Sequence, residues 1–255
     1  MRTTDFSKVL FDALQYSGND RHNITNETFA QFRDFASARM REAWESSQWP
    51  DICRLSPFTT SVDVNNVAYF TPAEEADEIL GVFSRNPQES TKAVQIPYQI
   101  YDTGSARRVV ISAQQADGYY LYRKDCPSLE GELYSPTVVY YQGAQVYFDS
   151  GSGTGSYTPV LGKPHAGNFY VCTAVSTTAG QNPNSHPASW TKIEIPYAFG
   201  AFMSWASATN WFVSEGQMQE ASIVEAKAKE VLEQEYDKIL RQQGQFGRLN
   251  MIQTY

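Results

Sequence analysis

The chain has 255 residues, of which 42% are hydrophobic and 14% aromatic, enough apolar material to form a folded core. Its formal net charge of −8 argues against a general nucleic-acid binder, which needs clustered Lys and Arg to neutralise phosphates. The arginine pair at 107–108 and the arginines at 33, 39 and 41 have acidic neighbours, which favours a solvated surface. No apolar run approaches the roughly eighteen residues of a membrane span. The N-terminal sequence MRTTDFSKVLFDALQ lacks the apolar stretch of a signal peptide, so we expect synthesis in a reducing cytoplasm.

Residue types that commonly carry chemistry are scattered along the chain. The three cysteines are Cys53, Cys126 and Cys172, and the three histidines are His22, His165 and His186. The cysteines form no disulfide framework or CxxC pair, and the histidines form no HxH or HxxxH pair. The GSGTG run at 151–155 lacks the Lys-Ser/Thr of a phosphate-binding loop, and no GxSxG motif is present. We therefore expect no catalytic residue, metal or cofactor, and no enzyme activity.

Two helices are predicted near the N-terminus. Apolar residues recur at helical spacing over 5–17, and residues 18–20 (Gly-Asn-Asp) supply a termination signal. A second helix is predicted to begin at Thr28, which forms a capping box with Gln31, and to end by Trp49-Pro50. The apolar stripe of this second helix is Phe29, Phe32, Ala36, Met40, Ala43 and Trp44.

The next segment changes to strand-like composition. Residues 58–70 are rich in β-branched and aromatic side chains, with a polar break at 65–66. The sequence Thr-Pro-Ala-Glu at 71–74 predicts a short helix ending near Leu80. Three further strand patterns follow, separated by turn sequences at 102–104 and 116–118, and predict a small antiparallel sheet. These patterns are KAVQIPYQIY (92–101), RRVVISA (107–113) and GYYLYRK (118–124).

Residues 137–195 differ again, because only four of them are charged and Ser, Thr and Gly dominate. Helical periodicity is absent, and short strands are expected at 138–141, 145–148, 169–174 and 191–195. We interpret this segment as a compact β-rich module inserted into a core domain made of residues 1–136 and 196–255.

The C-terminal segment predicts two consecutive helices. An aromatic and alanine-rich helix begins at Pro196, breaks at 214–216, and is followed by a charged amphipathic helix ending at Gln243. One face of the second helix carries Ala221, Val224, Ala228, Val231, Leu232 and Ile239. Residues 244–255 show no helical periodicity, yet they contain several large apolar side chains. Such a tail needs a partner to cover it.

Together these patterns predict an α+β fold. The N- and C-terminal helices form a helical domain with a small antiparallel sheet, and the β-rich module is inserted into it.

Within the module, the strand sequence GNFYVCTAVSTTAGQNP is followed by a Ser-Trp pair at 189–190. With this pattern the module resembles small carbohydrate-binding modules of the chitin-binding type. The resemblance implies that aromatic rings stack on sugar, with Tyr147, Tyr170 and Trp190 as the candidates. A role for Tyr170 and Trp190 in the core is the alternative.

The remaining segments follow one another in a particular order. The N-terminal helix DFSKVLFDALQYSGND is followed by the helix exit REAWESSQWPDIC. The chain then closes with the helical pair IPYAFGAFMSWASATNWFVSEGQMQEASIVEAKAKEVLEQE, with its Gly216-Gln217 break. In this order the chain resembles the head–tail connector, or adaptor, proteins of tailed bacteriophages. The 137–195 module departs from the family pattern.

This resemblance implies a structural virion protein at the neck, where a ring, expected to be twelvefold, links the portal to the tail. The implied partners are other copies of the chain, the portal, a tail or head-completion protein, and passing genomic DNA without sequence-specific contacts. No membrane is involved. The residues implied to dock on the portal are Phe246, Arg248, Leu249, Met251, Ile252 and Tyr255. The alternative function is a carbohydrate-binding or host-adsorption protein acting through residues 137–195.

Overall fold

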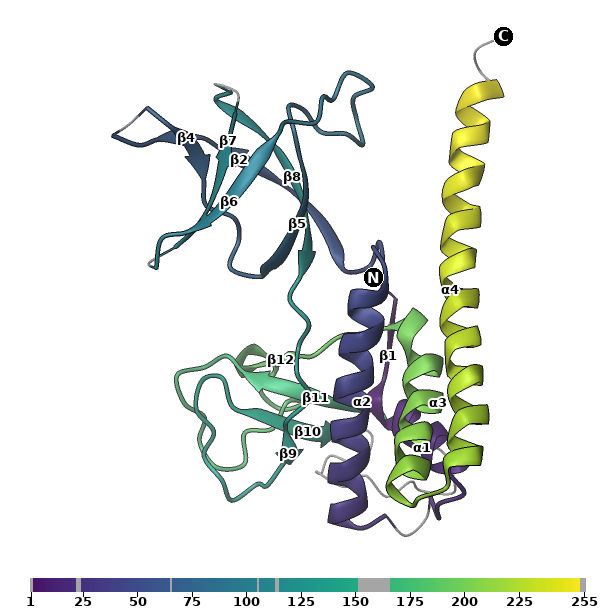
Figure 1. The fold of residues 1–255 in the computed structure, drawn as a ribbon. Coiled ribbons are helices and arrows are strands. Elements are labelled where there is room, and N and C mark those ends of the chain that lie inside the picture. The colour runs from purple at the N-terminus through teal and green to yellow at the C-terminus, as the bar shows by residue number, and fades with distance from the viewer. Residues whose placement is uncertain are drawn as a thin grey trace. The chain divides into compact units, whose positions relative to one another are not determined.

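The computed structural model describes residues 2–21, 24–64, 66–104, 106–112, 115–150 and 166–252, with side chains described as far as Arg241. The chain forms two compact units (Figure 1). Unit 1 comprises Met1–Ser47 and Pro127–Tyr255, and unit 2 comprises Gln48–Cys126. This division differs from the expected one, because residues 137–195 belong with the helices and residues 48–126 form the separate unit.

Unit 1 contains the four helices. They are α1 (Phe6–Tyr16), α2 (Asn26–Ser46), α3 (Tyr197–Ser214) and α4 (Met218–Ile252). The predicted capping box was wrong, because α2 begins earlier, where the Thr25 side chain accepts a hydrogen bond from the Thr28 amide at 3.1 Å. The predicted glycine breaks are confirmed: Gly18 and Gly216 have φ of 73° and 75° at the ends of α1 and α3.

Helix α3 lies at the centre of the helical layer and contacts α1, α2 and α4. Its buried side chains, including Phe199, Phe202 and Met203, fill the space between them. The predicted stripe of α2 is confirmed, since all six of its residues are buried. Because α1 and α2 come from one end of the chain and α3 from the other, this core closes only after most of the chain is present.

A four-stranded sheet completes unit 1, in the order β12-β11-β10-β9. Its strands are β9 (Glu132–Leu133), β10 (Gln145–Asp149), β11 (Gly167–Cys172) and β12 (Trp190–Lys192). β9 is parallel to β10, and the other pairs are antiparallel. A short 3-10 helix, η2 (Pro187–Ser189), precedes β12, and β1 (Thr3–Thr4) pairs with β13 (Ile195–Pro196).

The two faces of this sheet carry different clusters, because side chains alternate along each strand. On one face Tyr147 and Phe169 meet the helices, with ring centroids 5.0 Å from Phe29 and 4.7 Å from Phe6, respectively. The other face has its own buried cluster, which includes Val146. The expected strand at 138–141 was wrong, since only an isolated bridge between Tyr141 and Ser176 forms there.

Unit 2 contains two antiparallel sheets, in the orders β2-β8-β5 and β3-β4-β7-β6. Their strands are β2 (Cys53–Thr59), β3 (Ser61–Val62), β4 (Ala68–Phe70), β5 (Ala76–Phe83), β6 (Tyr98–Asp102), β7 (Arg107–Ile111) and β8 (Asp117–Lys124). One buried cluster joins the sheets, with Phe58 and Tyr120 from the first and Phe70 and Val109 from the second.

Two predictions for unit 2 were wrong. The expected helix ending near Leu80 is strand β5, whose Ile79 and Val82 are buried and which pairs with β8. The single expected sheet is two sheets, because β7 and β8 pair with different neighbours. The turn at 102–104 does join β6 to β7, with φ of 76° at Gly104, but Gly118 lies inside β8.

The α+β class is therefore confirmed, with helices from both ends of the chain packed together and several small antiparallel sheets in between. Among the helices that the structure describes, none is both long enough and apolar enough to cross a bilayer.

Candidate functional site

Residue types capable of catalysis stay dispersed in the structure. Across the described ranges, no three His, Cys, Asp or Glu side chains come together as metal ligands. His186 is exposed, with Nδ1 2.9 Å from the hydroxyl of its neighbour Ser185. His22, His165 and the GSGTG run at 151–155 lie outside the described residues. Burial raises the pKa of the Cys53 thiol, which keeps it in its unreactive protonated form.

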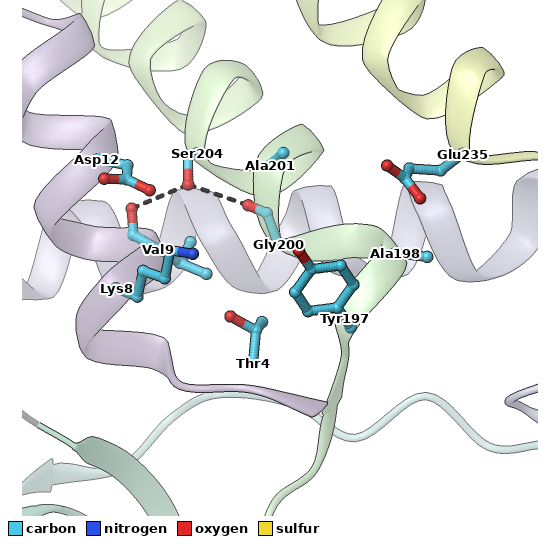
Figure 2. A pocket seen from close by; sticks show the side chains of 10 residues that line it. All are labelled: Thr4, Lys8, Val9, Asp12, Tyr197, Ala198, Gly200, Ala201, Ser204 and Glu235. Atoms are coloured by element: carbon cyan, nitrogen blue, oxygen red, sulfur yellow. Dashed lines mark hydrogen bonds between the residues drawn. The ribbon is translucent and has the colours of Figure 1, made fainter. Parts of the chain in front are cut away.

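A small cavity of about 90 Å³ lies between α1, α3 and α4 (Figure 2). Lys8 and Asp12 enter it from α1, Ser204 from α3 and Glu235 from α4. The volume holds on the order of three water molecules, well below the several hundred Å³ of a site for an ordinary organic ligand. It is a polar gap between helices rather than a substrate pocket.

Hydrogen bonding occupies the serine of this cavity. The Ser204 hydroxyl lies 3.0 Å from the Gly200 carbonyl oxygen and 3.2 Å from that of Val9, as the dashed lines in Figure 2 show. Its single proton is therefore shared between α3 and α1. Burial raises the pKa of Asp12, while the positive charges of Lys8 and Arg21 act in the opposite direction. The cavity thus connects the helices through polar contacts.

Two of the three aromatic residues considered for sugar binding are buried. Tyr147 is only 1% exposed and lies among the rings of Phe6, Phe29 and Phe169. Trp190 is 5% exposed, and its indole N–H donates to the Gln181 carbonyl at 3.2 Å. Tyr170 is half-buried. Sugar stacking needs an open ring face, and two of the three rings have none.

The arginines of the suspected basic clusters are mostly engaged in structural contacts. Arg33 pairs with Asp34 at 2.8 Å, and Arg108 lies over the Tyr69 ring at 4.4 Å. The Arg107 guanidinium donates to the carbonyl oxygen of Ala76 at 2.9 Å. These contacts tie up the cations that a phosphate-binding surface would need.

Arg39 joins three helices. Its guanidinium donates to Glu225 of α4 at 3.0 Å and to Asn210 of α3 at 2.8 Å, while Arg39 itself belongs to α2. Glu225 also pairs with Lys229, one helical turn further along α4, at 3.6 Å. Sequence spacing could find that local pair but had no signal for a partner 186 residues away.

The first half of α4 packs against α3. On the predicted apolar face, Ala221 and Ala228 are buried and the larger Val224, Val231 and Leu232 are half-buried. Small residues at these positions let the two helices approach closely. Because the helices are antiparallel neighbours, Glu235 of α4 shares the cavity with Tyr197, the first residue of α3.

The second half of α4 continues past the N-terminal end of α3 (Figure 1). Residues 236–252 extend the helix by about 25 Å at 1.5 Å per residue. Ile239 is half-buried and Leu240 is 45% exposed. α4 makes its main contacts with α3, so this distal half is the least supported part of the helix.

The residues expected to dock on a portal fall in this distal half. The helix was predicted to end at Gln243, but it continues through Gly244 to Ile252, so the expected nonhelical tail was wrong. A glycine inside a helix costs only about 1 kcal/mol and need not end it. Phe246, Arg248, Leu249, Met251 and Ile252 thus belong to α4, and Tyr255 lies outside the described residues.

No family model matches the sequence, and no curated protein matches it at a significant level. The candidate functional surface therefore has to be chosen from the geometry alone, and on that basis it is the distal half of α4.

Proposed function

We propose that the protein is a structural subunit of the head–tail connector of a tailed bacteriophage. In this proposal, copies of the chain assemble into a twelvefold ring at the virion neck, between the portal and the tail. The ring surrounds part of the channel through which genomic DNA passes. The observation that carries the proposal is the distal half of α4, which extends beyond the helix on which α4 packs.

An unsupported helix of this kind favours a role in assembly. Most of the stability of a helix in a protein comes from packing of its apolar face, so a helical segment without such packing is only marginally stable in water. Ile239 and the exposed Leu240 begin such a face just beyond α3. A portal or a neighbouring copy would cover it.

The proposed partners beyond the ring are the portal on one side and a tail or head-completion protein on the other. The net charge of −8 suits a channel through which DNA slides, since like charges repel and the DNA is not held. Burial of Tyr147 and Trp190 weighs against the alternative of a carbohydrate-binding protein.

Mass measurement of the protein alone and mixed with portal protein tests this proposal. We expect a ring complex with the portal, and loss of that complex when residues 244–255 are deleted. The matched control is Glu233→Ala, which changes an exposed residue on the proximal part of the same helix and should leave the complex intact.

Two results would contradict the proposal. One is a chain that stays monomeric with portal and tail proteins alike. The other is a truncated chain that binds the portal as well as the full chain does, which would remove the docking role of α4. Circular dichroism of the truncated protein guards against loss of folding as the explanation.

A further inference from the structure

One edge of the four-stranded sheet in unit 1 is hollowed, and this edge plays no part in the proposed connector function. β9 is the last strand in the order β12-β11-β10-β9, and hollows lie on both sides of it. One hollow has a volume of about 420 Å³ and the other about 340 Å³. Glu132 and Leu133, the two residues of β9, line both of them.

The two hollows lie on opposite faces of the sheet. The larger one is lined by Val146 and Tyr140, which belong to the cluster on the face away from the helices. The smaller one is lined by Phe29, Ala30 and Arg33 of α2, on the helix-covered face. Since alternate side chains of a strand point to opposite faces, a strand added beside β9 would send its side chains into both hollows.

The backbone of β9 offers hydrogen bonds to such a strand. The Tyr134 amide donates to the Tyr147 carbonyl on β10 at 2.9 Å. Successive backbone groups of a strand point in alternate directions, so the N–H and C=O of Leu133 point away from β10. Within the described residues, no other strand pairs with this outer edge.

Arg33 covers only one end of the edge. Its guanidinium donates to the carbonyl oxygens of Glu130 at 3.2 Å and Gly131 at 3.3 Å. The guanidinium also pairs with Asp34 at 2.8 Å, so its charge is already neutralised. The backbone of Leu133, next along the strand, is beyond these contacts.

The charge around the larger hollow identifies the kind of partner. Glu130 and Glu132 are exposed, and among the residues that the structure describes they are the only charged ones lining this hollow. Among the described residues neither carboxylate has an ion-pair partner within 4.0 Å. The rest of the lining is largely apolar, including Val138, which is 44% exposed. This combination complements an apolar segment that carries Lys or Arg.

We infer that the β9 edge is a docking site for an extended basic segment of a partner protein, which adds as a strand beside Leu133 and places alternating side chains in the two hollows. The cations of the segment lie against Glu130 and Glu132. The inference does not depend on the connector proposal, because it concerns a different surface of unit 1. β9 has only two residues, so the strand contributes few backbone hydrogen bonds and the side chains in the hollows supply most of the affinity.

A fluorescein-labelled hexapeptide of alternating lysine and valine is the probe. Fluorescence anisotropy with the full chain should give a dissociation constant of roughly 10 to 100 μM, equivalent to about 5.5 to 7 kcal/mol of binding free energy. The same peptide with glutamate in place of lysine should bind at least tenfold more weakly. Raising the salt concentration should weaken binding of the lysine peptide, because exposed ion pairs are screened.

Backbone methylation of the probe tests strand addition directly. Two isomers carry N-methyl groups on the valine amides or on the lysine amides. Since alternate amides face opposite directions, only one isomer should lose binding if the peptide pairs with β9. Equal binding by both isomers would overturn strand addition.

Charge reversal in the protein tests whether the peptide binds beside Glu130 and Glu132. Glu130→Lys with Glu132→Lys should weaken binding of the lysine peptide at least tenfold. The matched control, Glu220→Lys with Glu233→Lys, makes the same charge change on exposed residues of α4 and should leave binding within twofold. Equal loss in both double variants would mean nonspecific charge attraction and would overturn the inference.

Sedimentation of the same variants tests whether a second copy of the chain, rather than a partner protein, occupies the β9 edge. If the chain self-associates, the Glu130/Glu132 reversal abolishes that association, and the peptide does not bind, the edge is an interface between copies and the inferred partner segment is wrong.

Discussion

The core of unit 1 is built from segments that lie far apart in the sequence, whereas the core of unit 2 is built from one continuous segment. In unit 1, Phe6 near the N-terminus packs against Phe169, and the Ser204 hydroxyl of α3 bonds to Val9 of α1. In unit 2 every strand comes from the continuous segment Gln48–Cys126. Unit 1 therefore depends on contacts that pay a large loop-closure entropy, whereas unit 2 is assembled from neighbours in sequence.

Each unit can therefore be destabilised at a position within its own core. Both units contain a glycine at a position where a Cβ atom would collide with buried aromatic side chains. Substituting each glycine should destabilise its own unit, so the pair of substitutions tests whether the units unfold separately.

The largest effect is expected for Gly167→Ala in unit 1. The added Cβ would overlap the Tyr147 hydroxyl and lie 2.6 Å from its ring carbon Cζ. Tyr147 is buried between α1, α2 and the sheet and has no room to withdraw. We expect a loss of about 3 kcal/mol in the free energy of unfolding, at the upper end for overpacking, measured by urea denaturation.

Hydrogen exchange tells which unit is affected by this substitution. Amides of α1, α2 and β11 should lose protection, while amides of β2, β5 and β8 should keep it. The double variant Gly167→Ala/Tyr147→Phe removes the nearest overlapping atom and should recover part of the stability. Equal loss of protection in both units would show that they unfold as one.

A slightly smaller effect is expected for Gly118→Ala in unit 2. Its Cβ would lie 2.6 Å from the Phe83 carbonyl oxygen and 2.7 Å from Phe58 Cζ. The Phe58 ring stacks on Phe70, so it can shift only by disturbing both sheets. We expect a loss of about 2 kcal/mol, with hydrogen-exchange protection lost in β2, β5 and β8 and retained in unit 1.

A third effect concerns the long-range contacts of unit 1. Glu225→Gln removes the charge that Arg39 meets at 3.0 Å, where the two side chains are 22% and 16% exposed. We expect a cost of about 1 kcal/mol by urea denaturation, decreasing at high salt. The control Glu230→Gln breaks the exposed pair with Lys227 and should cost less than about 0.5 kcal/mol. Equal losses of unfolding free energy in the two variants would show that the Arg39–Glu225 pair stabilises unit 1 no more than an exposed surface pair does.

The sequence predicted the elements of unit 1 better than those of unit 2 for a physical reason. A helix shows its buried face through a repeat within a few residues, so the α2 stripe and the α3–α4 break were predicted correctly. Strand partners are set by contacts far along the chain. Nothing local in residues 107–124 says that β7 and β8 join different sheets, and the helix predicted before Leu80 failed for the same reason.

The surfaces were less predictable than the elements. Tyr147 and Trp190 looked suitable for sugar because composition does not reveal burial, and both lie in cores. The smaller hollow beside β9 joins residues of α2 to residues about a hundred positions later, which no spacing rule connects. The tail at 244–255 was predicted to need a partner, and that stays a prediction, while its helical conformation up to Ile252 was missed because this segment shows no helical periodicity.

The smallest effect compares acid sensitivity at one carboxylate in each unit. Burial alone would raise the pKa of Asp5, but hydrogen bonds from Lys192 and Asn168 outweigh it and hold the pKa below its usual value. In unit 2 the hydrogen bond from Tyr122, followed by that from Lys124, lowers the pKa of Glu75. A lowered folded pKa contributes stability above the unfolded value, near pH 4, and this stability is lost as pH falls through the folded pKa.

Asp5→Asn and Glu75→Gln should therefore each reduce the difference between the urea midpoints at pH 7 and pH 2.5. The reduction should be larger for Asp5, because its contacts join the start of α1 to β11 and β12, whereas those of Glu75 stay within the neighbouring strands of unit 2. Hydrogen exchange at the lower pH should show unit 1 opening first in the unmodified protein. In the Asp5→Asn protein, the difference in hydrogen-exchange protection between unit 1 and unit 2 at the lower pH should become smaller. If that difference stays unchanged, Asp5 does not set the acid sensitivity of unit 1.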